Sequence, residues 1–317
     1  MMNSSPWDKI DIANNNKILN GFLAYKNASI EFYWAKDILG NFLFVVHTKS
    51  QIEIENILNI QGIDIKIFSL KDKNQLVLKL LSKDDKDIFY ILCKDILNST
   101  KSIIDERITV RNILKRLEKW QYFLKNKKKL INKIALKGLI GELYFFKKYI
   151  LSNFDIQEAL EFWKAPLDFV HDFEISNITV EVKSKSSTNS ITISSYEQMF
   201  TELDKLYLFV VSMNESTKKV LNSINIYDII DEVKELIYNH NPLLIDKFEI
   251  LLLNYGFIPL DEYKEIYFVI VSDEFYEVRD NFPKIDSIPN GVEKLTYKIN
   301  LDICKEFLVE GDIFKNE

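Results

Sequence analysis

The fold of this chain is decided by residues 172–183, which read DFEISNITVEVK. Alternating apolar positions flank a two-residue Ser-Asn turn, so we predict a β-hairpin with strands over residues 167–175 and 178–184. When the residues beside the turn pair with each other, Asp172 comes to lie directly opposite Glu181.

Two carboxylates that face each other destabilise a sheet unless something offsets their charge. A divalent cation would do so, and hard oxygen ligands suit Mg²⁺, with Mn²⁺ as a substitute. Side chains alternate along a strand, so Lys183 and Lys185 share the face of Glu181, and Lys183 can orient an attacking water. The hairpin therefore predicts a metal site with Asp172 and Glu181 as ligands.

Neighbouring residues compete for supporting roles in this site. Asp168 shares the predicted face of Asp172 but lies opposite Lys185, which favours an ion pair over metal binding. His171 points to the other face, which favours a structural role. Gln198 could hydrogen-bond a phosphate or a water, although its capping-box spacing from Ser195 explains it equally well.

Glu142 is the only acidic residue from Lys119 through Phe154. Gly138 and Gly141 precede it in a predicted helix, where glycine costs stability unless the backbone must pack closely against a sheet. That packing would aim Glu142 at the hairpin, where a cation would offset its charge. The alternative is a salt bridge to a lysine of the same helix.

The net charge of -6 conceals a basic segment. Residues 101–150 hold 14 Lys and Arg against four acids, a local balance of +10 that leaves -16 for the remainder. A basic stripe beside an acidic cleft would suit binding of a phosphate backbone, while a solvated helix face is an equally good explanation. The candidate contacts are Lys125, Lys127, Lys128, Lys129, Lys133 and Lys137.

Composition excludes several classes of protein. The amino terminus lacks a basic region followed by an apolar run, and no stretch approaches eighteen uninterrupted apolar residues, so we expect neither secretion nor membrane insertion. Cys93 and Cys304 are too few and too far apart for a disulfide framework or a zinc site. We therefore expect a cytoplasmic globular protein.

The pattern along the chain predicts an α/β (α+β) protein with a mixed central sheet flanked by helices. Strands are expected at 29–35, 41–47, 64–69, 75–81, 88–93, 191–193, 206–212, 265–272 and 293–300. Helices are expected at 102–125, 130–151, 226–238 and 242–255, with another beginning at 195. We divide the chain into a β-rich amino-terminal region (1–100), a core with the basic helices and the hairpin (101–225), and a carboxy-terminal α/β region (226–317).

Short motifs in a fixed order resemble the PD-(D/E)XK nuclease superfamily. They are GLIGEL at 138–143, Trp163 and Pro166, HDF at 171–173, EVKS at 181–184, ISSYEQ at 193–198, YEVRDNFP at 276–283, IPNG at 288–291 and YKINL at 297–301. Their order is most similar to a family of PD-(D/E)XK-motif proteins found in bacterial restriction and phage-defence gene clusters.

The resemblance implies a restriction-endonuclease-like core. It gives Asp172 the place of the metal-binding aspartate, Glu181 that of the second acid, Lys183 that of the catalytic lysine and Glu142 that of the upstream helical glutamate. The Pro-Asp pair of the superfamily is not intact, since His171 precedes Asp172.

Residues and resemblance together favour a Mg²⁺-dependent DNA endonuclease of restriction or anti-phage defence. Its partners would be DNA and either a second copy or a defence-complex subunit, because double-strand cutting usually requires two active sites. One alternative is a catalytically silent subunit that binds DNA or assembles a complex. Another is a nuclease acting on RNA or on DNA ends.

Overall fold

The computed structural model describes residues 5–13, 19–27, 30–52, 59–125 and 131–315. The chain divides into two compact units, residues 1–128 and 129–317. The sequence-based division placed boundaries at 100 and 225, whereas the basic helix that ends at Lys125 lies in the first of these two units.

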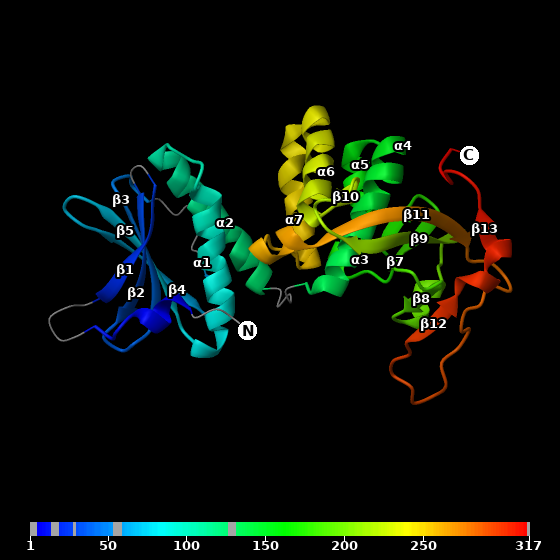
Figure 1. Ribbon diagram of the computed structural model, residues 1–317, viewed down its shortest axis with the longest axis horizontal. Helices are drawn as coiled ribbons and strands as arrows, with labels where there is room; N and C mark the ends of the chain where they lie inside the picture. The colour runs from blue at the N-terminus through cyan, green and yellow to red at the C-terminus, as the bar shows by residue number, and fades with distance from the viewer. Residues whose placement is uncertain (1–4, 14–18, 28–29, 53–58, 126–130, 316–317) are drawn as a thin grey trace. The chain divides into compact units, whose positions relative to one another are not determined.

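The first unit is an antiparallel sheet with two helices (Figure 1). Its strand order is β1-β2-β3-β5-β4. The strands are β1 (Leu19–Asn27), β2 (Ile30–Asp37), β3 (Phe42–Thr48), β4 (Ile63–Ser69) and β5 (Asn74–Leu80). The helices are α1 (Lys86–Thr100) and α2 (Glu106–Lys125).

A buried ion pair joins the two helices of this unit. Asp95 of α1 accepts hydrogen bonds from the Arg116 guanidinium, at 2.9 Å from Nε, and from Trp120 Nε1 at 2.9 Å. Because the buried carboxylate has charged and neutral donors, its desolvation is offset. This contact explains why α2 stays with the amino-terminal sheet.

The prediction of a strand at 88–93 is wrong, because these residues belong to α1. Phe89, Leu92, Cys93 and Ile96 are fully buried at helical spacing. A six-residue apolar run does not distinguish a strand from a buried helix. The other four predicted strands of this region are confirmed as β2 to β5, and β1 was not predicted.

The second unit is built on a mixed sheet of order β10-β11-β9-β7-β6, with β13 also paired to β11. Strands β7 and β9 are parallel and the other pairs are antiparallel, as the predicted mixed sheet requires. The strands are β6 (Phe173–Ile175), β7 (Ile178–Lys185), β9 (Lys205–Ser216), β10 (Ser223–Ile224), β11 (Tyr267–Glu277) and β13 (Leu308–Val309).

Helices cover one face of this sheet, and the small β8–β12 sheet with the carboxy-terminal turns covers the other (Figure 1). The helices are α3 (Lys133–Phe145), a π-helical continuation (Phe146–Ile150), α4 (Leu151–Asn153), α5 (Ile156–Phe162), α6 (Ile226–His240) and α7 (Ile245–Tyr255). The small sheet pairs β8 (Ser190–Ile193) with β12 (Tyr297–Asn300).

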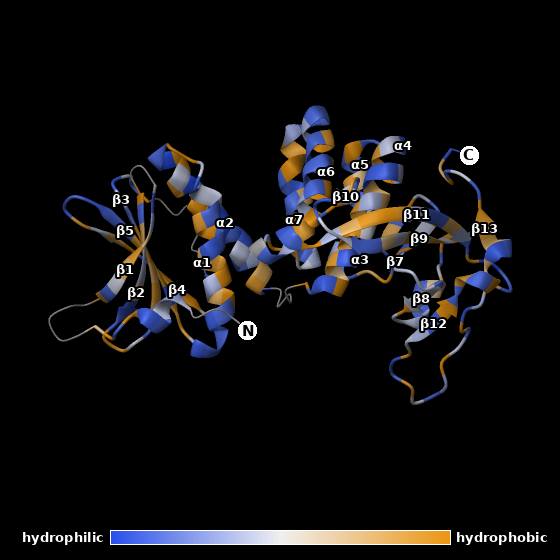
Figure 2. Ribbon diagram, viewed as in Figure 1, coloured by the Kyte–Doolittle hydropathy of each residue, from blue (hydrophilic) through white to orange (hydrophobic). Residues whose placement is uncertain are grey.

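Alternation along β7 separates core from site. Val180 and Val182 belong to the core beneath the helices, so Glu181 and Lys183 lie on the opposite face. Figure 2 shows the central strands largely in orange, which marks them as the apolar centre of the unit. Among the described residues, no helix is long and apolar enough to cross a membrane.

The predicted hairpin register is confirmed, with Ile175 paired to Ile178 and Phe173 to Val180. Its first strand is shorter than predicted, because β6 begins at Phe173 and residues 168–172 form no strand. The helix expected at 195 is a single 3₁₀ turn, Tyr196–Met199.

Candidate active site

Asp172 immediately precedes β6, and its side chain continues the hydrogen bonding between the two strands of the hairpin. Its Oδ2 accepts a hydrogen bond from the Val182 amide at 2.7 Å, in place of a backbone carbonyl. Burial raises the pKa of Asp172 to about 6, although the Lys183 charge and the Val182 amide act in the opposite direction. The carboxylate is therefore fixed at the edge of β7.

Glu181 is fully buried in the middle of β7. Its Oε1 accepts hydrogen bonds from Lys183 Nζ and from Gln198 Nε2, both at 2.6 Å. Its Oε2 is buried and has no hydrogen-bond partner among the described residues. Burial and the neighbouring charge of Asp172 raise the pKa of Glu181 to about 8.

Lys183 provides a positive charge at this cluster. Burial opposes its charged form, but Glu181 and Asp172 outweigh that effect and raise the pKa of Lys183 above its ordinary value. The ammonium also lies 3.3 Å from Gln198 Oε1. Lys183 thus remains charged at neutral pH.

Glu142 reaches the cluster from α3, with 5% of its surface exposed. Trp163 Nε1 donates to its Oε2 at 2.8 Å, and the Tyr255 hydroxyl donates to its Oε1 at 2.7 Å. Burial and the charge of Asp172 raise its pKa well above the ordinary value. The carboxyl group is thus held by two neutral donors and not by a lysine of its own helix.

Close packing of α3 on the sheet places Glu142. A Cβ added at Gly141 would lie 2.2 Å from Ser184 Oγ and 3.0 Å from Val211 Cγ1, so any other residue there would force the Ser184 side chain to move. At Gly138 the nearest atom would be the Tyr255 hydroxyl at 3.6 Å, an ordinary contact. The predicted close approach is therefore found at Gly141.

Gln198, in the 3₁₀ turn Tyr196–Met199, also contacts this cluster. Besides its bonds to Glu181 and Lys183, its Oε1 accepts from the backbone amides of Ser194 at 2.9 Å and Ser195 at 3.4 Å. The capping and the site explanations therefore both apply to this residue.

Asp168 does not occupy its expected place. It is an exposed turn residue with φ of 61°, after a 3₁₀ turn at Ala165–Leu167, so no strand register sets it opposite Lys185. Lys185 ends β7 and is half-buried.

Tyr255 was missed by sequence reasoning. It is the last residue of α7, 113 positions from Glu142, and nothing in its local pattern marks it. Trp163 was among the motifs of the resemblance, but its hydrogen bond to Glu142 was not predicted.

The donor set suits a hard cation. In the part of the chain that the structure describes, no group of three or more His, Cys, Asp and Glu side chains is arranged to hold a metal ion. Glu181 Oε2 nevertheless lacks, among the described residues, the hydrogen-bond partner that a buried oxygen normally has. Asp172 and Glu181 are therefore the residues that fit a divalent cation best.

The predicted basic contacts are distributed over both units. Lys125 is exposed at the end of α2 in the first unit, whereas Lys133 and Lys137 lie on α3 in the second. Lys133 pairs with Glu215 at 2.6 Å, and Lys137 donates to Ser186 Oγ at 2.6 Å. The remaining three, Lys127, Lys128 and Lys129, lie outside the described residues.

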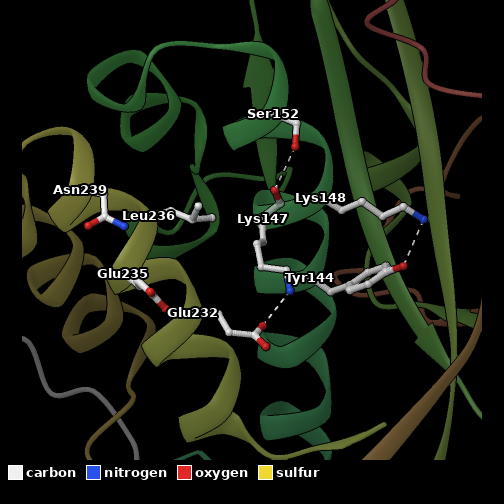
Figure 3. A pocket seen from close by; sticks show the side chains of 8 residues that line it. All are labelled: Tyr144, Lys147, Lys148, Ser152, Glu232, Glu235, Leu236 and Asn239. Atoms are coloured by element: carbon white, nitrogen blue, oxygen red, sulfur yellow. Dashed lines mark hydrogen bonds and ion pairs between the residues drawn. The ribbon is translucent and has the colours of Figure 1, made fainter.

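A surface pocket of about 630 Å³ lies between the α3 region and α6 (Figure 3). Lys147 points across it to Glu232, at 2.7 Å, which neutralises much of its charge. The residues that line it are Tyr144, Lys147, Lys148, Ser152, Glu232, Glu235, Leu236 and Asn239. None of them is a predicted site residue, so this pocket is separate from the acidic cluster, by which we mean Asp172, Glu181 and Glu142 with Lys183.

Comparison with known proteins identifies the family of the chain. Residues 3–302 match the model of a family described as "Putative PD-(D/E)XK family member, (DUF4420)". The chain belongs to this family. No curated protein and no solved structure matches it. Membership, with the mixed α/β fold, indicates a nuclease-like function.

Proposed function

We propose that this PD-(D/E)XK family member is a Mg²⁺-dependent endonuclease that hydrolyses phosphodiester bonds of DNA. The observation that carries the proposal is the gathering of Asp172, Glu181 and Lys183 at one hairpin, joined by hydrogen bonds at Val182 and Glu181, with the buried Glu142 of α3 near enough to feel the charges of Asp172 and Glu181. A structural core has no need of three neighbouring carboxyl groups, each of which burial makes costly to ionise.

Asp172 and Glu181 would hold the cation. Asp172 Oδ2 is already oriented by Val182, and Glu181 presents a buried oxygen without a partner. When bound, the cation would lower the pKa of a water ligand and neutralise charge that develops on the phosphate oxygens. Both carboxyl groups would then ionise, because burial raises the pKa of Asp172, burial and the charge of Asp172 raise that of Glu181, and a bound cation would offset both effects.

Lys183 would position the attacking water. Its ammonium is held by Glu181 Oε1 and lies within reach of Gln198, so its direction is fixed by two side chains. Gln198 keeps Glu181 Oε1 occupied, which leaves the other oxygen for the cation. Glu142 would add negative potential and bind through water, since both of its oxygens already accept hydrogen bonds.

Lys137 and Lys185 are the basic residues best placed to meet the DNA backbone. Burial is the main cause that lowers the pKa of Lys137; the charge of Glu215 opposes it, and repulsion by the charge of Lys185 adds to it. A phosphate would relieve this repulsion. We extend the proposal to restriction or anti-phage defence in the cytoplasm, with a second copy or partner subunit for double-strand cutting, on the resemblance described above.

A catalytically silent DNA-binding subunit is the second candidate. It is favoured by the absence, among the described residues, of three metal-ligating side chains in a metal-holding arrangement. The intact lysine and acids favour the enzyme, since a silent subunit needs none of them.

The deciding experiment is cleavage of supercoiled, linear and single-stranded DNA with Mg²⁺ or Mn²⁺. Lys183→Ala is compared with Lys218→Ala, which changes an exposed turn residue. Cutting by the wild type and the control, lost in a folded Lys183→Ala protein, would support the endonuclease. Binding of DNA without cutting by any of the three proteins would favour the silent subunit, and cutting of RNA alone would contradict the choice of DNA.

A further inference from the structure

Residues 167–170, which precede Asp172 in the chain, expose three large apolar side chains. We call this segment the apolar loop. Leu167, Phe169 and Val170 are 48%, 52% and 50% exposed. Single exposed apolar residues are common on protein surfaces, but three within four positions form a patch that a protein normally covers.

Hydrogen bonds fix the apolar loop to Asp172. The backbone amides of Lys164 and Ala165 both donate to the Asp172 carbonyl, at 2.8 and 3.2 Å. Pro166 on one side of the loop and His171 on the other are buried. The loop therefore holds its exposed side chains at a set position relative to a proposed metal ligand.

A cation accompanies the aromatic ring of the loop. Lys164 Nζ lies 5.5 Å from the centre of the Phe169 ring. The surface beside Asp172 thus offers an apolar ring and a positive charge together. Nucleic acid presents the complementary pair, a nucleobase with its apolar face and the phosphate that flanks it.

We propose that the apolar loop contacts nucleobases of the DNA substrate next to the phosphodiester bond that is cut. Phe169 stacks on, or wedges beside, a base, Leu167 and Val170 cover its edge, and Lys164 pairs with the adjacent phosphate. This inference rests on the proposed function. Because the loop is fixed to Asp172, base contact and positioning of the phosphate at the acidic cluster are achieved by one rigid segment.

DNA binding without cleavage tests the inference. Ca²⁺ replaces Mg²⁺, and affinity is measured by fluorescence anisotropy across a series of salt concentrations with DNA carrying 2-aminopurine. Phe169→Ala is expected to weaken binding by about tenfold, the effect of one lost stacking contact, with no change in the salt dependence. Lys164→Gln is expected to reduce the slope of log affinity against log salt concentration by about one, the effect of one lost phosphate contact.

Two controls separate stacking from general surface change. Leu221→Ala removes an apolar side chain that is 84% exposed in the turn before β10, and should leave affinity unchanged. Phe169→Trp keeps an aromatic ring and should keep both the affinity of the wild type and the change in 2-aminopurine fluorescence that accompanies wild-type binding.

Each other outcome overturns the inference. If wild-type protein binds and cuts DNA while Phe169→Ala binds equally well, the loop makes no base contact and the proposed function stands. If wild-type protein binds no DNA, both fail. If Phe169→Ala instead dissociates a dimer, seen by light scattering, with base fluorescence unaffected, the loop is a surface for a second copy.

Discussion

Glu181→Gln is expected to stabilise the metal-free protein at pH 8 while it abolishes metal-dependent activity. The carboxyl of Glu181 is fully buried and lies beside the charge of Asp172. Ionising it therefore costs free energy that a bound cation would offset. Glutamine has the same shape and carries no charge.

The magnitude follows from the raised pKa of Glu181, about 8 against an ordinary 4.5. Each tenfold change in proton affinity is about 1.4 kcal/mol, so the ionised form costs at most about 5 kcal/mol. The folded protein keeps its proton while the unfolded chain loses it, so stability falls as pH rises from 4.5 to about 8. Asp172, raised from 3.8 to about 6, acts in the same direction over its own range.

Glutamine recovers only part of this cost. Its amide nitrogen would occupy the place of an oxygen that has no partner among the described residues, a penalty of about 1–3 kcal/mol. The net gain is therefore at most about 2–4 kcal/mol at pH 8 in EDTA. Below pH 4.5 the wild-type carboxyl is neutral in both states, so the ionisation cost is absent and the amide penalty of about 1–3 kcal/mol should leave Glu181→Gln the less stable protein.

The assay is urea denaturation in EDTA at pH 5 and pH 8, read from hydrogen exchange of β7 peptides, which reports the second unit alone. Glu202→Gln, an exposed change in the loop before β9, is the control and should match the wild type. Added Mg²⁺ should stabilise the wild type and not Glu181→Gln. A Glu181→Gln protein that is less stable than the wild type at pH 8 in EDTA would refute the reasoning.

Three further substitutions test the packing and the hydrogen bond that hold Glu142 in place. Gly141→Ala should destabilise the protein by about 1–3 kcal/mol, because its Cβ would overlap Ser184. A Cβ at Gly138 would meet only the Tyr255 hydroxyl, at 3.6 Å, so Gly138→Ala should be neutral or stabilise the protein by up to about 1 kcal/mol through its higher helix propensity. Equal melting temperatures for Gly141→Ala and Gly138→Ala would contradict both expectations. Tyr255→Phe should cost about 1 kcal/mol and lower the cleavage rate with little change in KM, because Glu142 loses one donor; a wild-type rate in single-turnover kinetics would show that the hydroxyl has no positioning role.

Local sequence was sufficient where a short-range rule decides the structure. The Ser-Asn turn and its flanking alternation predicted the Ile175–Ile178 register, and with it the face shared by Glu181 and Lys183. Gly141 was predicted to allow close packing, and it does.

Local sequence failed where long-range contacts decide. The 88–93 segment has apolar content that either a strand or a helix could bury, and packing in the first unit made it helical. Residues 167–170 continue the apolar pattern of β6, yet the turn after Ala165 places them in solvent.

The sequence by itself determined the hairpin and the mixed α/β class, and it marked Asp172, Glu181, Lys183 and Glu142 as candidate site residues. Periodicity and turn chemistry act over a few residues, so they can be read directly from the chain. Only the tertiary structure decided that Trp163 and Tyr255 hold Glu142, that Gln198 meets Glu181, and which oxygen is left without a partner. These contacts join residues 17 to 113 positions apart, and their geometry arises only when helices and strands pack together.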